Sequence, residues 1–370
     1  MGRFRTAGVM RLAFVVYGSL SERSGGFRYD RKLVEVLRER GHEVRIVGLP
    51  WERYGKSLLH NATTDLRSRL AGFDAVLEDH LCHPSLVRAN RTLGTPVVSV
   101  VHHLRSSEPR ASWKNSFYRA VERAYFRSLD AALCNSETTQ KSVESLCRLP
   151  TAVGYPAGNR FLTSADDQFA AEAANQSNLC RFDGPLRLVF LGNLIERKGL
   201  HVLLSGLAAV SGDWELTIIG APTDERYAAR VRRLRDRLGL HERVTFTGRL
   251  TGEAVTDRLA QSHALVVPSL YEGFGLVYLE GMAFGLPAVA TTAGGAREIV
   301  SHGKTGFLLP PGDADAIADA VRTLRDDRTA LREMSDAARE RYESWPTWAK
   351  TAETVERLLA GVIESETTIA

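Results

Sequence analysis

The 370-residue sequence predicts an α/β protein made of two doubly wound, Rossmann-like domains. Short apolar runs rich in β-branched residues alternate with longer runs of helical spacing along nearly the whole chain, which is typical of parallel sheets with crossover helices. A polar segment at residues 165–185, ending in Asp-Gly-Pro, separates two sets of such runs and predicts a linker. The length also favours two cores over one.

Each half of the chain contains six strand-like runs. In the first half they are at residues 11–18, 43–50, 75–79, 96–103, 131–136 and 151–156, with helices expected at 32–41 and 117–129. In the second half they are at 187–193, 214–220, 243–250, 264–269, 287–294 and 305–311. We therefore predict an N-terminal domain at residues 1–180 and a second domain at 181–345. Ligands of such sheets bind beyond the carboxyl ends of the strands.

Composition excludes several classes of protein. The chain is 44% hydrophobic and 25% charged, and its apolar runs are too short to span a bilayer, so a cytoplasmic protein is expected. The four cysteines (Cys82, Cys134, Cys147 and Cys180) have no zinc-type spacing and predict free thiols. No nucleic-acid-binding module is recognisable. Whether the protein forms oligomers does not follow from the sequence.

Charge is uneven, with 25 Lys and Arg against 18 Asp and Glu in residues 1–180. The surplus is concentrated in Arg105, Arg110, Lys114, Arg119, Arg123 and Arg127, beside Trp113, Phe117, Tyr118, Tyr125 and Phe126. Such a patch suits the surface of an anionic membrane or an anionic acceptor. A solvated helix face whose aromatic side chains enter the core explains it about as well.

The segment PSLYEGFGLVYLEGMAFG, residues 268–285, is the most informative about function. A strand ending near Val267 would deliver Glu272 into a loop, and the apolar spacing that follows predicts a helix with Glu280 one to two turns inside it. Both carboxylates could face one ligand, and glycines with free N–H groups at a helix start attract a phosphate. An ordinary strand, turn and helix with solvated glutamates is the alternative.

Several motifs together resemble glycosyltransferase family 4. These are VVPSLYEGFGLVYLE with the following GLPAVATTAGGAREIVSHGKTGFLLPPGD, upstream LRLVFLGNLIERKGLHVLLSGL, and GSLSERSGGFRYDRKLVEVLRERGHEV near the start. The resemblance covers nearly the whole chain. It implies a GT-B fold whose domains face across a cleft, with a C-terminal helix at residues 346–370 that returns to the N-terminal domain. Trp345-Pro346 would supply the necessary break.

The resemblance also implies a reaction and its participants. A retaining transfer would move a sugar from a nucleotide diphosphate sugar to a hydroxyl acceptor, without a metal or other cofactor, in the setting of cell-envelope or exopolysaccharide assembly. Phosphorylase or sucrose-synthase-like chemistry, and a catalytically silent subunit that binds sugar nucleotides, remain alternatives. The donor, the acceptor and the linkage do not follow from the sequence.

Individual positions take roles from this resemblance. Arg197 and Lys198 would stabilise the departing diphosphate, Glu272 would bind the transferred sugar, and Glu280 would bind the ribose. His102 would hydrogen-bond the reacting region, with His103 pointing the other way. The other expected donor contacts are the loop glycines Gly25 and Gly26, then Gly192 and Asn193, the base-reading Gly248, Arg249 and Leu250, and the N–H groups of Phe274, Gly275 and Leu276.

One apparent metal motif has a simpler explanation. Asp313-Ala-Asp315 matches a D-x-D pattern, but it follows Pro310-Pro311-Gly312 and opens a predicted helix. Aspartates at that place cap helix N–H groups. A glycosidase pair is likewise disfavoured for Glu272 and Glu280, because such a pair must flank the scissile bond.

Overall fold

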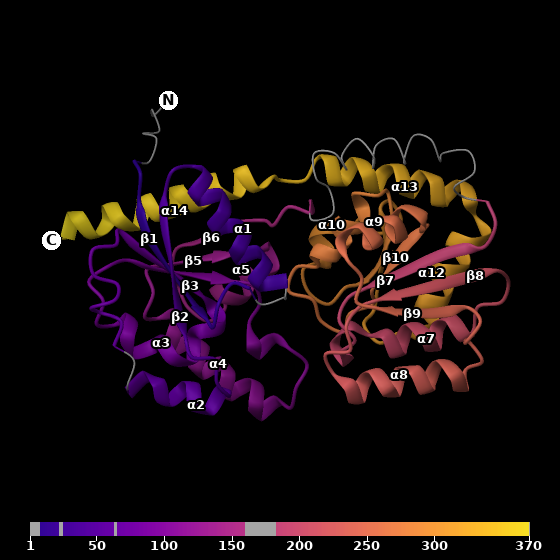
Figure 1. Cartoon of the computed structure of the whole chain (residues 1–370), viewed down its shortest axis with the longest axis horizontal. Helices are drawn as coiled ribbons and strands as arrows, with labels where there is room; N and C mark the ends of the chain where they lie inside the picture. Colours follow the sequence, from indigo (N-terminus) through magenta and orange to yellow (C-terminus); the bar gives the residue numbers. More distant parts are fainter. Residues whose placement is uncertain (1–7, 22–24, 63–64, 160–182, 370) are drawn as a thin grey trace. The chain divides into compact units, whose positions relative to one another are not determined.

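The computed structural model describes residues 8–21, 25–62, 65–159 and 183–369 and divides the chain into two compact units (Figure 1). Unit 1 comprises Met1–Pro156 and Pro346–Ala370, and unit 2 comprises Ala157–Trp345. Each unit has a six-stranded parallel sheet with helices, which confirms the predicted fold class. The boundary at 156/157 precedes the predicted one at 180/181, and most of the predicted linker lies outside the described residues.

The sheet of unit 1 has the strand order β2-β1-β3-β4-β5-β6. Its strands are β1 (Arg11–Tyr17), β2 (Glu43–Leu49), β3 (Ala75–Asp79), β4 (Val97–Val101), β5 (Ala131–Cys134) and β6 (Thr151–Val153). The central strands β3, β4 and β5 are buried at every position. Burial on both faces explains why they appear in the sequence as continuous apolar runs.

Helices cover both faces of this sheet. They are α1 (Gly25–Glu39), α2 (Tyr54–Leu59), α3 (His83–Asn90), α4 (Ser112–Phe126), α5 (Glu137–Glu144) and α14 (Trp348–Ile369), with short 3-10 turns η1 (His60–Ala62), η2 (His80–Cys82) and η3 (Arg105–Ser107). In Figure 1, α1 and α14 lie on one face, and α3 and α4 lie on the other. Tyr125 and Phe126 of α4 are fully buried in the core on that second face.

Helix α1 begins earlier than predicted. The sequence predicts a helix at residues 32–41 and places the glycine pair Gly25-Gly26 in the loop before it, but α1 begins at Gly25 and both glycines belong to its first turn. The buried positions of this helix extend back through Phe27, Tyr29 and Asp30. Packing of those side chains therefore outweighs the low helix propensity of glycine.

The last helix, α14, packs on unit 1. Glu356 accepts hydrogen bonds from Arg40 Nε and Nη2 at 2.6 and 2.8 Å and contacts His42 Nε2 at 2.9 Å. Thr351 donates a hydrogen bond to the carbonyl of Tyr155. These contacts join residues more than 190 positions apart, so α14 is part of the fold of unit 1 rather than an appendage.

Unit 2 has the strand order β12-β11-β10-β7-β8-β9. Its strands are β7 (Leu186–Leu191), β8 (Trp214–Ile219), β9 (Val244–Gly248), β10 (Ala264–Val266), β11 (Ala288–Thr291) and β12 (Gly306–Leu309). Its helices are η4 (Glu196–Lys198), α7 (Leu200–Ala208), α8 (Glu225–Arg237), α9 (Gly252–Gln261), α10 (Leu276–Met282), α11 (Ala296–Ile299), α12 (Ala314–Asp326) and α13 (Arg328–Glu343). Asp313 caps α12 by accepting from the Ala316 N–H at 2.9 Å, as predicted for this aspartate.

Candidate functional site

The predicted donor residues of unit 2 follow the carboxyl ends of its strands. Gly192 and Asn193 come directly after β7, Gly248 ends β9 and is followed by Arg249 and Leu250, and Glu272 comes a few residues after β10. Because all six strands are parallel, these segments meet at one edge of the sheet. This is the edge at which open α/β sheets bind ligands.

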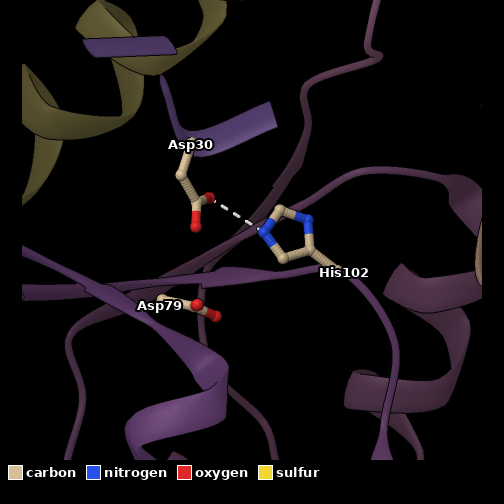
Figure 2. Close-up of side chains that lie close together, drawn as sticks. All are labelled: Asp30, Asp79 and His102. Carbon is tan, nitrogen blue, oxygen red and sulfur yellow. Dashed lines mark hydrogen bonds and ion pairs between the residues drawn. The ribbon is translucent and has the colours of Figure 1, made fainter. Parts of the chain in front are cut away.

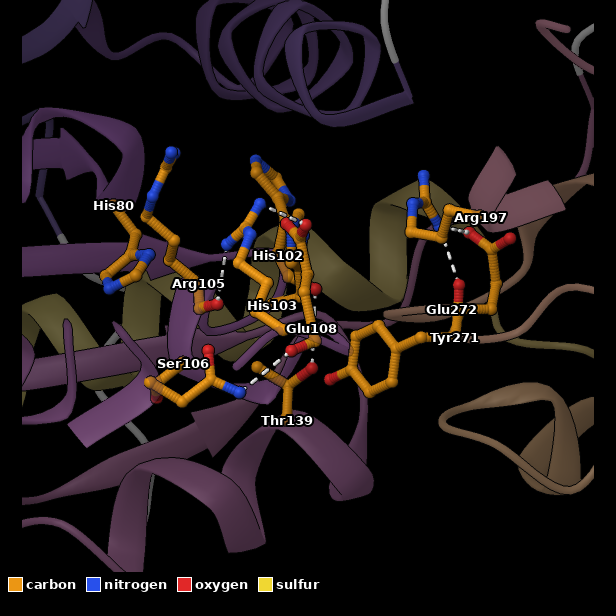
Figure 3. Close-up of polar contacts among 12 residues, drawn as sticks. His80, His102, His103, Arg105, Ser106, Glu108, Thr139, Arg197, Tyr271 and Glu272 are labelled. Carbon is orange, nitrogen blue, oxygen red and sulfur yellow. Dashed lines mark hydrogen bonds and ion pairs between the residues drawn. The ribbon is translucent and has the colours of Figure 1, made fainter. Parts of the chain in front are cut away.

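The loop after β7 is bonded to the loop after β10 (Figure 3). The Leu270 N–H donates to the Arg197 carbonyl at 2.7 Å, and Arg197 Nη1 donates to the Tyr271 carbonyl at 2.7 Å. Lys198 Nζ donates to Glu272 Oε2 at 2.5 Å. The folded chain thus brings together the two predicted cations and the first glutamate of the motif.

The Glu272 carboxylate lies in a strongly positive environment. Arg197 Nη1 is 3.6 Å from Oε1, and Ser269 Oγ donates to Oε2 at 3.1 Å, in addition to the contact with Lys198. Burial by itself would raise the pKa of Glu272, but the charges of Lys198 and Arg197 outweigh it and lower the pKa to about 2. Glu272 is therefore ionised at neutral pH.

The backbone of Glu272 is held against the loop after β11. The Glu272 N–H donates to the Ala293 carbonyl at 3.1 Å, and the Gly295 N–H donates to the Glu272 carbonyl at 3.0 Å. Gly294, between them, has a φ of +102°, and a Cβ there would lie 1.9 Å from the Glu272 carbonyl oxygen. Only glycine fits this position, so Gly294 fixes where Glu272 enters the site.

Residues 274–280 form the start of helix α10. Gly275 is its N-terminal flanking residue and Leu276 its first residue. Glu280 lies inside the helix, as predicted, and its side chain is buried, which the sequence did not predict. Phe274 is also buried, and its ring lies 5.9 Å from the ring of Trp345. That Glu272 and Glu280 face one ligand stays a prediction.

In unit 1, His102 follows β4 and pairs with a buried carboxyl group (Figure 2). His102 Nε2 lies 2.8 Å from Oδ1 of Asp30 in α1, and Asp79 at the end of β3 lies in the same cluster. A Cβ at Gly26 would lie 2.9 Å from Cδ2 of His102, so the helix start packs directly on the imidazole. Burial lowers the pKa of His102, although the Asp79 charge opposes this.

His103 has a different partner from His102. Its Nε2 lies 3.0 Å from Glu108 Oε1, and Glu108 also accepts from Arg110 at 2.6 Å. One third of the His103 side chain is exposed, whereas the His102 side chain is about nine-tenths buried. The two neighbouring histidines are thus held separately.

The predicted basic and aromatic patch is only partly a surface feature. Tyr125 and Phe126 are fully buried, because they are core residues of α4 and cannot belong to a patch. Trp113 and Phe117, by contrast, are 71% and 48% exposed. Arg105 stacks over Tyr118, with its guanidinium carbon 4.8 Å from the ring centre.

Two residues of the candidate site were not identified from the sequence, Asp79 beside His102 and Ser269 beside Glu272. Asp79 ends the run AVLED, and the position of a carboxyl group at the end of a buried parallel strand was the signal that marks it. Ser269 directly precedes the β10 loop residues but has no sequence signature of its own. Among the described cysteines, Cys82, Cys134 and Cys147 are free, and Cys180 lies outside the described residues.

Comparison with known proteins gives the family. The family model described as Glycosyl transferases group 1 matches residues 173–341, and the model described as Glycosyltransferase Family 4 matches residues 23–153. A GDP-mannose-dependent alpha-mannosyltransferase of Mycobacterium tuberculosis is 30% identical over 386 residues, which cover 91% of this chain and 93% of that protein. The chain belongs to glycosyltransferase family 4.

Another relative is covered only in part by the match to this chain. A glycogen synthase of M. tuberculosis is 29% identical over 281 residues, which cover 74% of this chain but only 64% of the relative. The chain therefore matches less than two thirds of the length of that relative.

Solved structures show the GT-B fold for this family 4 chain. Sucrose-phosphate synthase from Thermosynechococcus elongatus matches with a TM-score of 0.80 and 23% identity, over 96% of this chain and all of that one. Anabaena HepE in complex with UDP-glucose matches with a TM-score of 0.75 and 19% identity, over 95% and 100%. Within the described part of the chain, no helix is both long and apolar enough to cross a membrane.

Proposed function

We propose that the protein is a retaining glycosyltransferase that moves a sugar from a nucleotide diphosphate sugar to a hydroxyl acceptor. The observation that carries this proposal is the cluster of Arg197, Lys198 and Glu272 beyond the carboxyl ends of β7 and β10. A departing nucleoside diphosphate gains negative charge as the glycosidic bond breaks, and preorganised cations stabilise that charge. Arginine supplies positive charge as a planar group that can hold two phosphate oxygens, and lysine supplies it as a mobile point charge.

Donor binding would exchange partners within this cluster. Lys198 and Arg197 now share the Glu272 carboxylate, and a diphosphate would compete with that carboxylate for both cations. Glu272 would then turn to hydroxyl groups of the transferred sugar. Glu280 would accept from the ribose, and the N–H groups at the start of α10 would reach sugar or phosphate oxygens.

We assign neither glutamate the role of nucleophile. The Glu272 carboxylate contacts two cations and a serine hydroxyl. These contacts favour a role in binding and charge stabilisation over covalent attack on the sugar. The proposed displacement runs on one face of the sugar, with the leaving phosphate helping to deprotonate the acceptor. His102 would hydrogen-bond the reacting region.

The donor class is inferred from two relatives. One solved structure of the same fold holds UDP-glucose, and the mannosyltransferase relative is named for GDP-mannose, so UDP- and GDP-sugars are the first candidates. We propose that no metal is needed for the chemistry. Support comes from Arg197 and Lys198, which can offset the diphosphate charge that a divalent cation would otherwise balance.

A thermal-shift screen of the full chain against UDP-, GDP-, ADP- and TDP-sugars, with and without chelator, tests the donor proposal. A donor at one hundred times its dissociation constant should stabilise the fold by roughly 2.7 kcal/mol. Lys198→Met should abolish that shift. The matched control is Lys304→Met, because Lys304 is exposed and precedes β12, at the opposite edge of the sheet. A shift that survives Lys198→Met, or one that needs a metal, would contradict the proposal.

Product analysis separates transfer from the other activities possible on this fold. Incubation with the identified donor and a panel of hydroxyl acceptors should give a glycoside with the anomeric configuration of the donor. Turnover that instead requires free phosphate identifies a phosphorylase. Donor binding with neither hydrolysis nor transfer identifies a silent subunit.

We further propose that unit 1 touches an anionic membrane from the cytoplasmic side, in cell-envelope or exopolysaccharide assembly. The supporting observation is the exposure of Trp113 and Phe117 on successive turns of α4, with Lys114 Nζ 5.3 Å from the centre of the Trp113 ring. Phe117 also lies against Tyr54 of α2, so the two helices form one face. Aromatic and basic side chains together favour the interface of anionic lipid.

A further inference from the structure

Two buried aspartates lie behind His102. Asp30 comes from α1 and Asp79 ends β3, and both are fully buried. Each offers a carboxylate oxygen to a cluster with His102 in which the three potential ligand atoms lie within 4.8 Å of one another. Figure 2 shows that Nε2 of the imidazole points at Asp30, while Nδ1 lies on the other side of the ring.

The hydrogen bonds of this cluster leave three buried polar atoms without a partner among the described residues: Oδ2 of each aspartate and Nδ1 of His102. Asp79 Oδ1 accepts from the Leu81 N–H at 2.9 Å, and Asp30 Oδ1 lies 2.8 Å from His102 Nε2. The second oxygens, Asp30 Oδ2 and Asp79 Oδ2, are buried and have no donor among the described residues. Each aspartate has a carboxylate oxygen within 4.8 Å of one on the other aspartate, so a single proton held between the two side chains would give them the donor that they lack.

Charge repulsion between the two buried carboxyl groups also favours a proton on one of them. Two ionised carboxylates side by side in a buried site repel each other and lose their hydration, so one of them stays protonated. Burial raises the pKa of Asp30 well above its ordinary value, against the hydrogen bond with Asp79. Burial and the charge of Asp30 raise the pKa of Asp79 to about 7. The pair titrates as a unit rather than as two independent acids.

We propose that Asp30 and Asp79 share one proton, and that this acid pair is a positioning device that holds His102 as a neutral imidazole with its proton on Nε2. Asp30 accepts the hydrogen bond from this Nε2–H group, and Gly26 and Tyr29 pack on the ring. The Tyr29 ring centre lies 5.1 Å from that of His102, edge to face. Nδ1 is an acceptor in this tautomer, and in this structure it is buried and has no hydrogen-bond partner among the described residues.

What this arrangement of His102 does for sugar transfer rests on the proposed function. A neutral His102 with Nε2 bonded to Asp30 could accept a hydrogen bond only through Nδ1, and it brings no positive charge to the place where the glycosidic bond would break. Asp30 and Asp79 then act on the reaction only through the orientation and charge of His102. Other titratable groups face this cluster: Tyr17 of β1 interacts with Asp79, Tyr29 of α1 with Asp30, Cys82 of η2 with both aspartates, and His80 of η2 with His102.

The shared proton can be measured in the full-length wild-type protein without any turnover. NMR spectra of protein whose aspartates carry ¹³C at Cγ, with the two resonances assigned by means of Asp30→Asn and Asp79→Asn, should show that Asp30 and Asp79 together hold one proton at neutral pH and titrate together. Two ionised carboxylates at neutral pH would overturn the proposal. So would elemental analysis that finds one tightly bound metal ion per chain which is lost in Asp79→Asn, because an ion would take the place of the proton.

The tautomer of His102 is the second readout. In ¹⁵N-histidine spectra assigned with His102→Gln, wild-type His102 should be neutral and protonated on Nε2, and it should lose this single state in Asp30→Ala. Asp79→Asn should retain it, because the amide donates the one hydrogen bond that the shared proton supplied. A charged His102 at neutral pH, or a spectrum unchanged in Asp30→Ala, would overturn the proposal.

Kinetics connect the device to transfer. Asp30→Ala should lower kcat by about 10- to 100-fold with a smaller effect on donor KM, while Asp79→Asn retains most activity. The matched control is Glu108→Gln, which removes the carboxylate partner of the neighbouring His103 and should leave kcat within about twofold. An equal loss in Glu108→Gln and Asp30→Ala would refute the positioning role. Absence of transfer by the wild type with the acid pair present would instead refute the proposed function.

Discussion

Lys198 and Glu272, 74 residues apart in the chain, are joined by a 2.5 Å hydrogen bond between the ammonium and carboxylate groups. The family resemblance assigns the lysine to the diphosphate and the glutamate to the transferred sugar. In this structure the two hold each other at the carboxyl edge of the unit 2 sheet. The cluster therefore stabilises the fold before any donor binds, and its contribution can be measured by itself.

Replacing Glu272 with glutamine should destabilise unit 2 and abolish transfer. The folded-state pKa of Glu272, about 2, lies below its ordinary value of 4.5, so its contribution is present above pH 4.5 and is lost as the pH falls towards 2. The shift corresponds to a contribution on the order of 3 kcal/mol at neutral pH. Chemical denaturation of wild type and Glu272→Gln between pH 2 and 7 checks this. The control is Glu333→Gln on the exposed side of α13.

A difference in stability that stays constant over this pH range would contradict the assignment, because the ion pair with Lys198 would then contribute nothing that titrates. Retained transfer by Glu272→Gln would contradict its role towards the donor. The two results are independent, since one is measured without ligand.

Gly294→Ala should displace Glu272, whereas Gly312→Ala should not. Both glycines have positive φ, +102° and +80°, so alanine is strained at either position by about 1–2 kcal/mol. Only at Gly294 does the new methyl group also collide with backbone, the carbonyl of Glu272. We expect Gly294→Ala to cost roughly 3 kcal/mol or more and to weaken donor binding. Equal melting temperatures for the two variants would show that the close approach to Glu272 is unimportant.

Glu356→Gln should loosen α14. The hydrogen bonds from Arg40 lower the pKa of Glu356, so this glutamate stabilises the protein at neutral pH and stops doing so as the pH falls. A loss of about 1 kcal/mol is expected, since Arg40 remains partly exposed. The exposed pair of Lys350 and Glu353 on the same helix provides the control, Glu353→Gln, with a negligible effect. Thermal unfolding that ranks the two variants in the opposite order would contradict this.

Membrane contact through α4 should depend on Trp113 and Phe117. In sedimentation with anionic vesicles, Trp113→Ser with Phe117→Ser should reduce binding about tenfold or more, because two exposed aromatic side chains lose their apolar insertion. Raising the salt concentration should weaken wild-type binding as well. Trp51→Ser, at another exposed aromatic position of unit 1, tests whether the effect is confined to α4. Wild-type binding indifferent to salt and to lipid charge would remove this proposal.

Asp79→Asn should stabilise the protein at alkaline pH. The folded-state pKa of Asp79, about 7, lies above its ordinary value of 3.8, so the folded state loses stability as the pH rises from about 4 to 7. An amide removes that loss, and we expect a gain of roughly 1 to 3 kcal/mol at pH 8 that disappears near pH 4. Urea unfolding at the two pH values measures it. A variant that is less stable than wild type at pH 8 would contradict the raised pKa.

The strands were predictable because the central strands of a parallel sheet are buried on both faces and therefore form continuous apolar runs, as β3 and β4 do. The residues at which helices and strands begin and end were harder to predict. Gly25 and Gly26 suggest a turn by local propensity, and only the packing of Phe27 and Tyr29 extends α1 over them. Periodicity alone also could not tell that Tyr125 is a core residue and Trp113 an exposed one.

The candidate site was predictable where a motif is local and not where partners are distant. Glu272, Arg197 and Lys198 lie in short recognisable segments, but the bond between Lys198 and Glu272 depends on how the loops after β7 and β10 meet. Asp30 and Asp79 have no motif in common. Their carboxyl groups form a pair only because α1 packs beside the end of β3.

Helix α14 also determines the order in which the protein can be completed during translation. All of unit 2 is synthesised before Thr351 and Glu356, which unit 1 needs for its bonds to Tyr155, Arg40 and His42. At about 5–20 residues per second, the first 156 residues wait roughly 10 to 40 s on the ribosome for their last helix. Unit 2 is one uninterrupted stretch and can fold during that interval, whereas any product that terminates before residue 346 leaves unit 1 with an uncovered apolar face for chaperones and proteases to recognise.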